Sequence, residues 1–165
     1  MLKTKRLIIR PYTIEDAKEA FALFNDIAVM EFIPSGTDKV PNDTVNRVIK
    51  YISHYNTYGF SKYVILEKNT NRLIGDCGIC RIENTDINEL GYRIKKEFWN
   101  QGFATEAAIA VIDYAFKFLK FREIHAIVES KNIKSVYILE NKLGFSYTGE
   151  LFCYGQNFDL YRLEN

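Results

Sequence analysis

The sequence has few of the residues that build metal clusters, disulfide frameworks or histidine-dependent nucleophilic sites. It holds three cysteines and two histidines in 165 residues. Cys77 and Cys80 form a Cys-x-x-Cys run, but no second cysteine or histidine pair is available to complete four metal ligands. We therefore expect no metal, and we expect Cys77 and Cys80 to be small buried apolar residues. Cys153 stands alone, and a role as thiol nucleophile would require a histidine nearby. His54 and His125 fall in helical and strand patterns, and neither belongs to a Ser-His-Asp arrangement.

The sequence also lacks a charge excess and a long apolar run. Lys and Arg number 22 against 21 Asp and Glu, which leaves a net charge of +1. Nucleic-acid binding needs a basic face, so we expect no nucleic-acid partner. The apolar run near the start ends at Arg10, too early for a signal peptide, and no later stretch is long enough to span a membrane. A cytoplasmic location without a membrane partner is the default expectation.

The apolar content and the length of the chain are sufficient for one folded domain. Apolar residues make up 47% of the chain and charged residues 26%, which is typical of a globular protein. A chain of 165 residues can bury a sizeable core, so we expect one domain over residues 1–165.

Hydrophobic periodicity predicts an α/β protein with a mixed sheet of about seven strands and about four helices. The helix over 104–117 connects two strands, which favours parallel neighbours there, whereas the hairpin at 66–73 is antiparallel. The segment 28–41 is expected to be irregular. The expected strands are 6–10, 62–67, 72–82, 89–94, 124–128, 146–152 and 158–163, and the expected helices are 14–25, 45–59, 104–117 and 133–143.

The segment 89–107 combines a short strand, a glycine turn and the start of a helix. Residues 89–94 alternate, Asn100-Gln101-Gly102 is a turn signal, and an apolar helical run follows Phe103. The first amides of a helix have no partners within the helix, and the helix dipole favours negative charge there. Because Gly102 lacks a Cβ, a phosphate can approach the main chain closely. The pattern therefore indicates a pyrophosphate-binding turn.

This segment resembles the acyl-coenzyme A signature of the GNAT acetyltransferases, in which Gln or Arg precedes a Gly-x-Gly/Ala turn. Gly102 and Ala104 match the signature, but Trp99 stands where Gln or Arg is usual. The longer run 98–107 is similar to the form found in the RimJ/RimL-like branch, which acetylates the N-termini of ribosomal proteins. A lone Gly-x-Ala turn also occurs in plain strand–helix connections, so the match needs support elsewhere in the chain.

A second motif supplies that support. Asn132-Ile133-Lys134-Ser135, followed by Leu143-Gly144-Phe145, resembles the Asn-x-x-Ser…Leu-Gly-Phe helix of the same family, with one residue inserted before the Gly-Phe. The order of elements also resembles the GNAT acyl-CoA N-acyltransferase fold over nearly the whole length of the chain. Two motifs on the expected elements are much more specific than either alone.

The resemblance implies acetyl-CoA as cosubstrate, with no metal. The amides of the turn are expected to hold the pyrophosphate, the main chain at the end of the preceding strand is expected to pair with the pantetheine arm, and Asn132 to contact that arm while capping its helix. The cofactor-binding residues implied are Ile94, Lys95, Asn100, Gln101, Gly102, Phe103, Ala104, Thr105, Asn132 and Ser135.

Glu89 is the residue that the resemblance implies as catalytic base. Some GNAT enzymes carry a glutamate on this strand, and the context here is Glu-Leu-Gly-Tyr. A partly buried carboxylate can accept the proton that an ammonium must lose before its nitrogen attacks the thioester. A solvated carboxylate at the start of a strand is the alternative. Many family members also use a tyrosine seven residues after the asparagine as acid, but Leu139 occupies that place.

The expected partners are acetyl-CoA and an amine acceptor, in a chain for which homodimerisation is left open. The acceptor is a protein N-terminus if the branch resemblance holds. Alternatives are a small amine, a polyamine or an antibiotic, and, in another class of function, a non-catalytic acyl-CoA-binding module. The residues that would border the acceptor in this family are Phe32, Tyr63, Tyr92 and Phe152.

Overall fold

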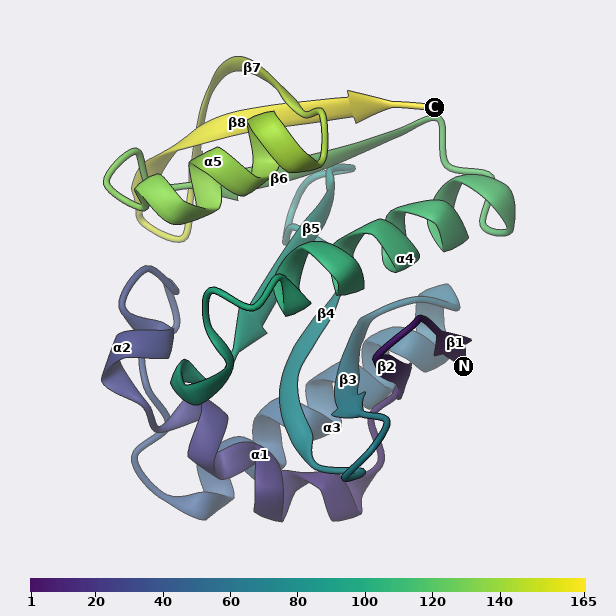
Figure 1. Cartoon of the computed structure of the whole chain (residues 1–165). Helices are drawn as coiled ribbons and strands as arrows, with labels where there is room; N and C mark the ends of the chain where they lie inside the picture. The colour runs from purple at the N-terminus through teal and green to yellow at the C-terminus, as the bar shows by residue number, and fades with distance from the viewer.

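One twisted sheet with helices on both faces forms the protein (Figure 1). The computed structural model describes all 165 residues. The eight strands lie in the order β1-β2-β3-β4-β5-β6-β8-β7. The strands are β1 Leu2–Lys3, β2 Leu7–Pro11, β3 Lys62–Glu67, β4 Leu73–Arg81, β5 Asn88–Ile94, β6 Glu123–Val128, β7 Ser146–Cys153 and β8 Gln156–Glu164, and the helices are α1 Ala17–Phe24, α2 Ile27–Met30, α3 Pro41–Tyr58, α4 Phe103–Lys117 and α5 Ile133–Lys142.

The predicted class of fold is confirmed, with one more strand and one more helix than expected. All neighbouring strands are antiparallel except β5 and β6, which are parallel and joined by α4, as the pattern predicted. The additional strand β1 has two residues and the additional helix α2 has four. Elements this short carry too few residues to show a period, so hydrophobic patterning does not reveal them.

The segment 28–41 is therefore not wholly irregular, because it contains most of α2 and the first residue of α3. Helix α3 begins at Pro41, four residues before the expected apolar stripe. Proline suits the first turn of a helix, and the Asp43 carboxylate accepts hydrogen bonds from the amides of Lys39 at 2.8 Å and Val40 at 3.1 Å. The helix ends at Gly59, whose φ of 78° closes it in the left-handed conformation.

Two hydrophobic clusters lie on opposite faces of the sheet. Because side chains alternate along a strand, Val64 and Leu66 pack with α1 and α3, whereas Tyr63 and Ile65 pack with α4. Along β5 the same alternation directs Leu90 into the cluster beneath α4. Glu89, Gly91 and Arg93 consequently share the face covered by α1 and α3.

Strands β5 and β6 separate soon after they meet. The ladder between them has one residue pair, Glu89 with His125, although β5 continues to Ile94 and β6 to Val128. The two ribbons point apart in Figure 1. The edge of β5 that faces β6 is therefore without a strand partner beyond Glu89. None of the helices combines the length and the apolar character that crossing a membrane requires.

Candidate functional site

Free main-chain amides gather where β5 leads into α4. Asn100 and Gly102 have left-handed φ angles of 59° and 78°, and α4 begins at Phe103 with Gly102 as its N-cap. The first amide of this region that is bonded within the protein is that of Glu106, which donates to the carbonyl of Gly102 at 3.0 Å. The amides of residues 101–105 make no such bond. This concave run of donors at the positive end of a helix is suited to an anion with several oxygens.

Trp99 has a structural role in this loop. Its indole Nε1 donates a hydrogen bond of 2.6 Å to the carbonyl of Ile94, and the Lys134 ammonium of α5 lies 5.0 Å from the centre of the ring. The loop is thereby folded back on the end of β5. This contact accounts for tryptophan at a position where the family signature has Gln or Arg.

Arg6 ties the same loop to the N-terminal strand, which the sequence did not indicate. Its guanidinium donates to the carbonyl of Gln101 at 2.9 Å and to the Glu106 carboxylate at 2.6 Å, and it covers the Phe103 ring at 4.2 Å. Burial raises the pKa of Glu106, but hydrogen bonds from Thr4 and Arg6 outweigh it and leave the pKa lowered. A positive charge therefore lies beside the free amides.

The main chain at the end of β5 was expected to pair with the pantetheine arm through Ile94 and Lys95, and only part of it is free to do so. The Lys95 amide donates to the carbonyl of Ile74 in β4 at 2.8 Å, and the Lys95 carbonyl accepts from Phe98 at 2.9 Å. Both groups already have a backbone partner, so the pairing of Lys95 with a pantetheine arm stays a prediction that its amide does not support. Since main-chain groups alternate in direction along an antiparallel ladder, those of Ile94 and Tyr92 point to the open edge.

Asn132 and Ser135 lie at the start of α5, on the other side of that edge. The Asn132 side chain caps the helix by accepting from the Ser135 amide at 3.2 Å, as expected. The Ser135 hydroxyl lies 3.0 Å from the phenol oxygen of Tyr92. Burial raises the pKa of Tyr92 to about 12, so this phenol is neutral and joins β5 to α5.

The inserted residue in the second motif is absorbed in the last turn of α5. The Leu143 amide donates to the carbonyl of Ile138, five residues back, and the Phe145 amide donates to that of Leu139, six residues back. The final turn is thus wider than an α-helical turn. Leu139 is buried in the core, so no acidic hydroxyl is present there. Tyr137 is half-exposed.

Glu89 is partly buried and has one charged neighbour. Its carboxylate makes no hydrogen bond within the protein, its side chain is 18% exposed, and its Oε2 atom lies 3.6 Å from the Lys62 ammonium. Its negative charge acts on two groups at the end of β7, the thiol of Cys153 and the phenol of Tyr154. Burial first and then Glu89 raise the pKa of both, to about 12 for Tyr154. A carboxylate with unused lone pairs can accept a proton.

Of the residues expected to border the acceptor, two do not lie on the same face as Glu89. Tyr63 is buried in the core beneath α4, and Tyr92 points toward α5, so their place beside the acceptor stays a prediction. Strand alternation explains this, because each is displaced from the Glu89 face by one position. Phe152 is 70% exposed on the edge strand β7, and Phe32 is half-buried after α2.

Cys77 and Cys80 lie within a strand, as the sequence pattern predicted. Cys77 and Cys80 belong to β4, and Cys77 is fully buried while Cys80 is partly buried. Burial raises the pKa of the Cys77 thiol to about 12, which keeps it protonated at neutral pH. A buried neutral thiol is a poor nucleophile and a poor metal ligand.

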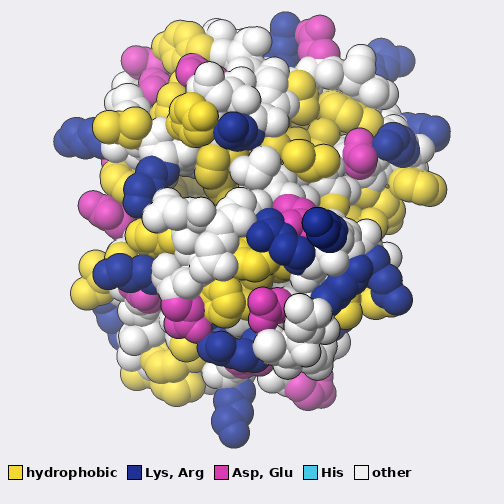
Figure 2. Space-filling model, viewed as in Figure 1, with side chains coloured by type: hydrophobic (Ala, Val, Ile, Leu, Met, Phe, Trp, Pro, Cys, Tyr) yellow, Lys and Arg dark blue, Asp and Glu magenta, His cyan; other side chains and the backbone are white.

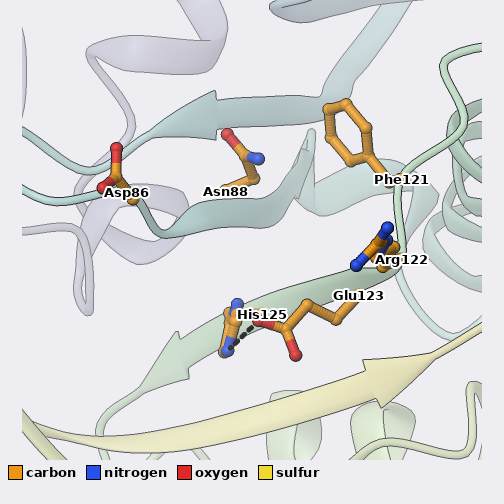
Figure 3. Close-up of a pocket in the computed structure, with 6 residues that line it drawn as sticks. All are labelled: Asp86, Asn88, Phe121, Arg122, Glu123 and His125. Carbon is orange, nitrogen blue, oxygen red and sulfur yellow. Dashed lines mark ion pairs between the residues drawn. The ribbon is translucent and has the colours of Figure 1, made fainter.

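A small polar pocket of about 150 Å³ lies at the amino ends of β5 and β6, at the opposite end of β5 from Gly102 (Figure 3). It contains none of the predicted site residues. His125 faces Glu123 there at 3.8 Å, and burial lowers the pKa of His125. On the molecular face shown in Figure 2, acidic and basic side chains are interspersed, in keeping with the small net charge.

Comparison with known proteins gives consistent matches. A family model described as an acetyltransferase (GNAT) domain matches residues 6–146. The N-acetyltransferase p20 of Bacillus licheniformis is 31% identical over 166 residues, which cover 97% of this chain and 92% of that protein. A GNAT-family acetyltransferase structure from Bacillus anthracis is 26% identical with a TM-score of 0.81, covering 98% of this chain and 95% of the other.

A similar fold is also found in RimL, the ribosomal L7/L12 α-N-protein acetyltransferase, in complex with coenzyme A. The TM-score is 0.80 over 98% of this chain and 95% of that one, with 16% sequence identity. At this identity the likeness concerns the fold alone.

Proposed function

The chain belongs to the GNAT acetyltransferase family, and on this premise we propose that it transfers the acetyl group of acetyl-CoA to a primary amine by direct attack within a ternary complex. The family assignment makes it an acetyl-CoA-dependent N-acetyltransferase, which sets aside a non-catalytic acyl-CoA-binding module. The observation that carries the proposal is the run of free amides at residues 101–105, next to the open edge of β5.

In this proposal the amides of the turn bind the pyrophosphate of acetyl-CoA. Gly102 permits the close approach, and the N-terminus of α4 supplies a favourable dipole. The pantetheine arm adds to the open edge of β5, where the Ile94 amide and the main-chain groups of Tyr92 are without a backbone partner, whereas the Ile94 carbonyl accepts from Trp99. A β5 amide on this edge stabilises the oxyanion that forms when the thioester is attacked.

Glu89 is proposed as the base. The acceptor arrives as an ammonium, which has no lone pair, and Glu89 takes its proton directly or through one water. The nitrogen then attacks the thioester carbonyl. The tetrahedral intermediate collapses as the C–S bond breaks, and the attacking nitrogen gives up its second proton, which water carries to the departing CoA thiolate. No tyrosine stands at position 139 to protonate that thiolate, so water is proposed as the acid.

We favour a protein N-terminus as the acceptor. The supporting observation is the similarity of the segment 98–107 to the RimJ/RimL-like form. A small amine, a polyamine or an aminoglycoside is the second candidate.

The test is a comparison of kcat/KM for acetyl-CoA with three classes of amine: tetrapeptides with free N-termini, spermidine and kanamycin. The proposal expects the peptides to give the highest value. A higher kcat/KM for spermidine or kanamycin would instead favour a polyamine or an aminoglycoside as the acceptor. Blocking the peptide N-terminus should abolish transfer, because the attacking nitrogen is then an amide.

Replacing Gly102 by glutamate should weaken CoA binding by about tenfold or more, because it adds bulk and negative charge where the pyrophosphate is proposed to bind. Calorimetric titration with CoA measures the change. Space is available for the new side chain, since a Cβ at this position would meet only the Arg6 guanidinium, at 3.6 Å.

Gly59→Glu is the matched control. Gly59 has the same φ of 78° and caps α3, and a Cβ there would meet no atom within 4 Å. It carries the same backbone strain without approaching the loop. If both variants fold and bind CoA equally well, the loop is not the phosphate site.

A further inference from the structure

Lys62 reaches across the sheet to Glu89 over two glycines. Its ammonium donates to the carbonyl of Gly78 at 3.1 Å and lies 3.6 Å from the Glu89 carboxylate. Lys62 pairs with Gly78 across β3 and β4, and Gly78 pairs with Gly91 across β4 and β5. The side chain therefore runs from β3 over two positions without side chains and ends beside Glu89.

The glycine at position 91 is what leaves room for this contact. A Cβ at Gly91 would lie 2.5 Å from the Lys62 ammonium and 3.0 Å from Glu89 Oε1. Both distances are shorter than ordinary contacts, so any other residue would push the two charged groups apart. Gly91 therefore accompanies Lys62 and Glu89 as part of one arrangement.

The Lys62 ammonium is shielded from water, so its charge acts strongly on the Glu89 carboxylate. The Lys62 side chain is 10% exposed, and Glu89 has no other charged partner within 4 Å. Burial lowers the pKa of Lys62, but the charge of Glu89 reverses this effect and leaves the pKa raised. Lys62 thus stays protonated at neutral pH, so it is neither a nucleophile nor a base.

We propose that Lys62 is a positioning residue that holds the Glu89 carboxylate ready to accept the proton of the incoming amine. This inference rests on the proposed role of Glu89 as base. A fixed cation beside Glu89 also repels a second ammonium, so an amine that reaches the carboxylate gives up its proton more readily.

The other titratable groups around this pair do not cancel the charge of Lys62. Asp76 and Arg93 neutralise each other in an ion pair of 2.6 Å. Burial raises the pKa of the nearby thiols and of Tyr154 and lowers that of His54, so all of these groups are neutral at pH 7. The groups facing the pair are Asp76 and Cys80 of β4, Arg93 of β5, His54 of α3, and Cys153 and Tyr154 at the end of β7.

The first experiment measures the pH profile of kcat/KM for Lys62→Met, using acetyl-CoA with the tetrapeptides, spermidine and kanamycin. Methionine keeps much of the apolar stem and removes the charge. We expect the rising limb of the profile to move to higher pH, since the fixed positive charge that favours the ionised carboxylate is removed. Affinity for CoA should not change.

Gly91→Ala tests the role of Lys62 with both charged residues in place. The added Cβ should separate Lys62 from Glu89 and move the rising limb of the pH profile to higher pH. A residue that only stabilised the fold would lower the melting temperature and leave the limb where it is. An unmoved limb in folded Lys62→Met would overturn the proposal.

The second experiment needs no acceptor. In protein labelled with ¹³C at the lysine Cε, NMR titration follows Lys62, whose signal is identified by its loss in Lys62→Met. Glu89→Gln should lower the pKa of Lys62, since burial then acts without compensation. An unchanged pKa would contradict the coupling. Absence of turnover in the wild-type protein would instead count against the proposed function, and the titration would still decide whether the pair is coupled.

Discussion

Glu89→Gln should lower kcat by about a hundredfold to ten-thousandfold, the range that loss of a positioned general base typically costs. Glutamine keeps the size of the side chain but cannot accept the proton. The remaining activity should rise with pH, because more of the amine then arrives deprotonated. CoA affinity should barely change, since the carboxylate lies on the face covered by α1 and α3, away from the free amides of the loop.

Glu123→Gln is the control for this change. Glu123 belongs to the polar pocket at the amino end of β6 and is 45% exposed. Its replacement should leave kcat within a few-fold of the wild type. If Glu89→Gln also retains turnover within a few-fold across the pH range, Glu89 is a surface carboxylate and the proton leaves by another route.

Asp76→Asn should reduce the free energy of unfolding by about 3–5 kcal/mol, the range measured when one partner of a buried ion pair is removed. Asp76 is fully buried and accepts two hydrogen bonds from the Arg93 guanidinium, at 2.8 and 2.6 Å. Asparagine leaves the Arg93 charge buried without a counter-charge. Chemical denaturation monitored by circular dichroism measures the loss.

Two comparisons isolate the cause. Asp113→Asn removes an exposed pair with Lys117, whose side chains are 57% and 65% exposed, and should cost less than about 0.5 kcal/mol. Asp76→Asn combined with Arg93→Met should lose less than Asp76→Asn alone, because no unpaired charge remains. A loss below about 1 kcal/mol for Asp76→Asn would mean that water reaches the Arg93 guanidinium.

The parts of the site that could be predicted from the sequence are local ones. The strand, turn and helix over 89–107 follow from alternation, a glycine and an apolar run, all within this one short segment of sequence. The N-cap at Asn132 is local in the same sense, since it involves a residue three positions away. Propensity and spacing act at this range, so the sequence indicates such features reliably.

The contacts that tie the site together are not local. Arg6 meets Glu106 from 100 residues away, and Lys62 reaches Glu89 only because β3, β4 and β5 are adjacent in the sheet. No spacing rule connects such residues before the strand order is known. The same reason explains why the sequence did not indicate the surroundings of Tyr63 and Lys95, since strand register decides which face a side chain occupies and which neighbour an amide meets.

We propose that coenzyme A binds along the end of β5 and the start of α4. An NMR titration of the ¹⁵N-labelled protein with CoA tests this placement. We expect the amide signals of residues 101–105 and of Ile94 to shift together and saturate together, while those of the pocket residues Asp86 and His125 do not move. Saturable shifts confined to the amino ends of β5 and β6, with the signals of residues 101–105 unchanged, would contradict it.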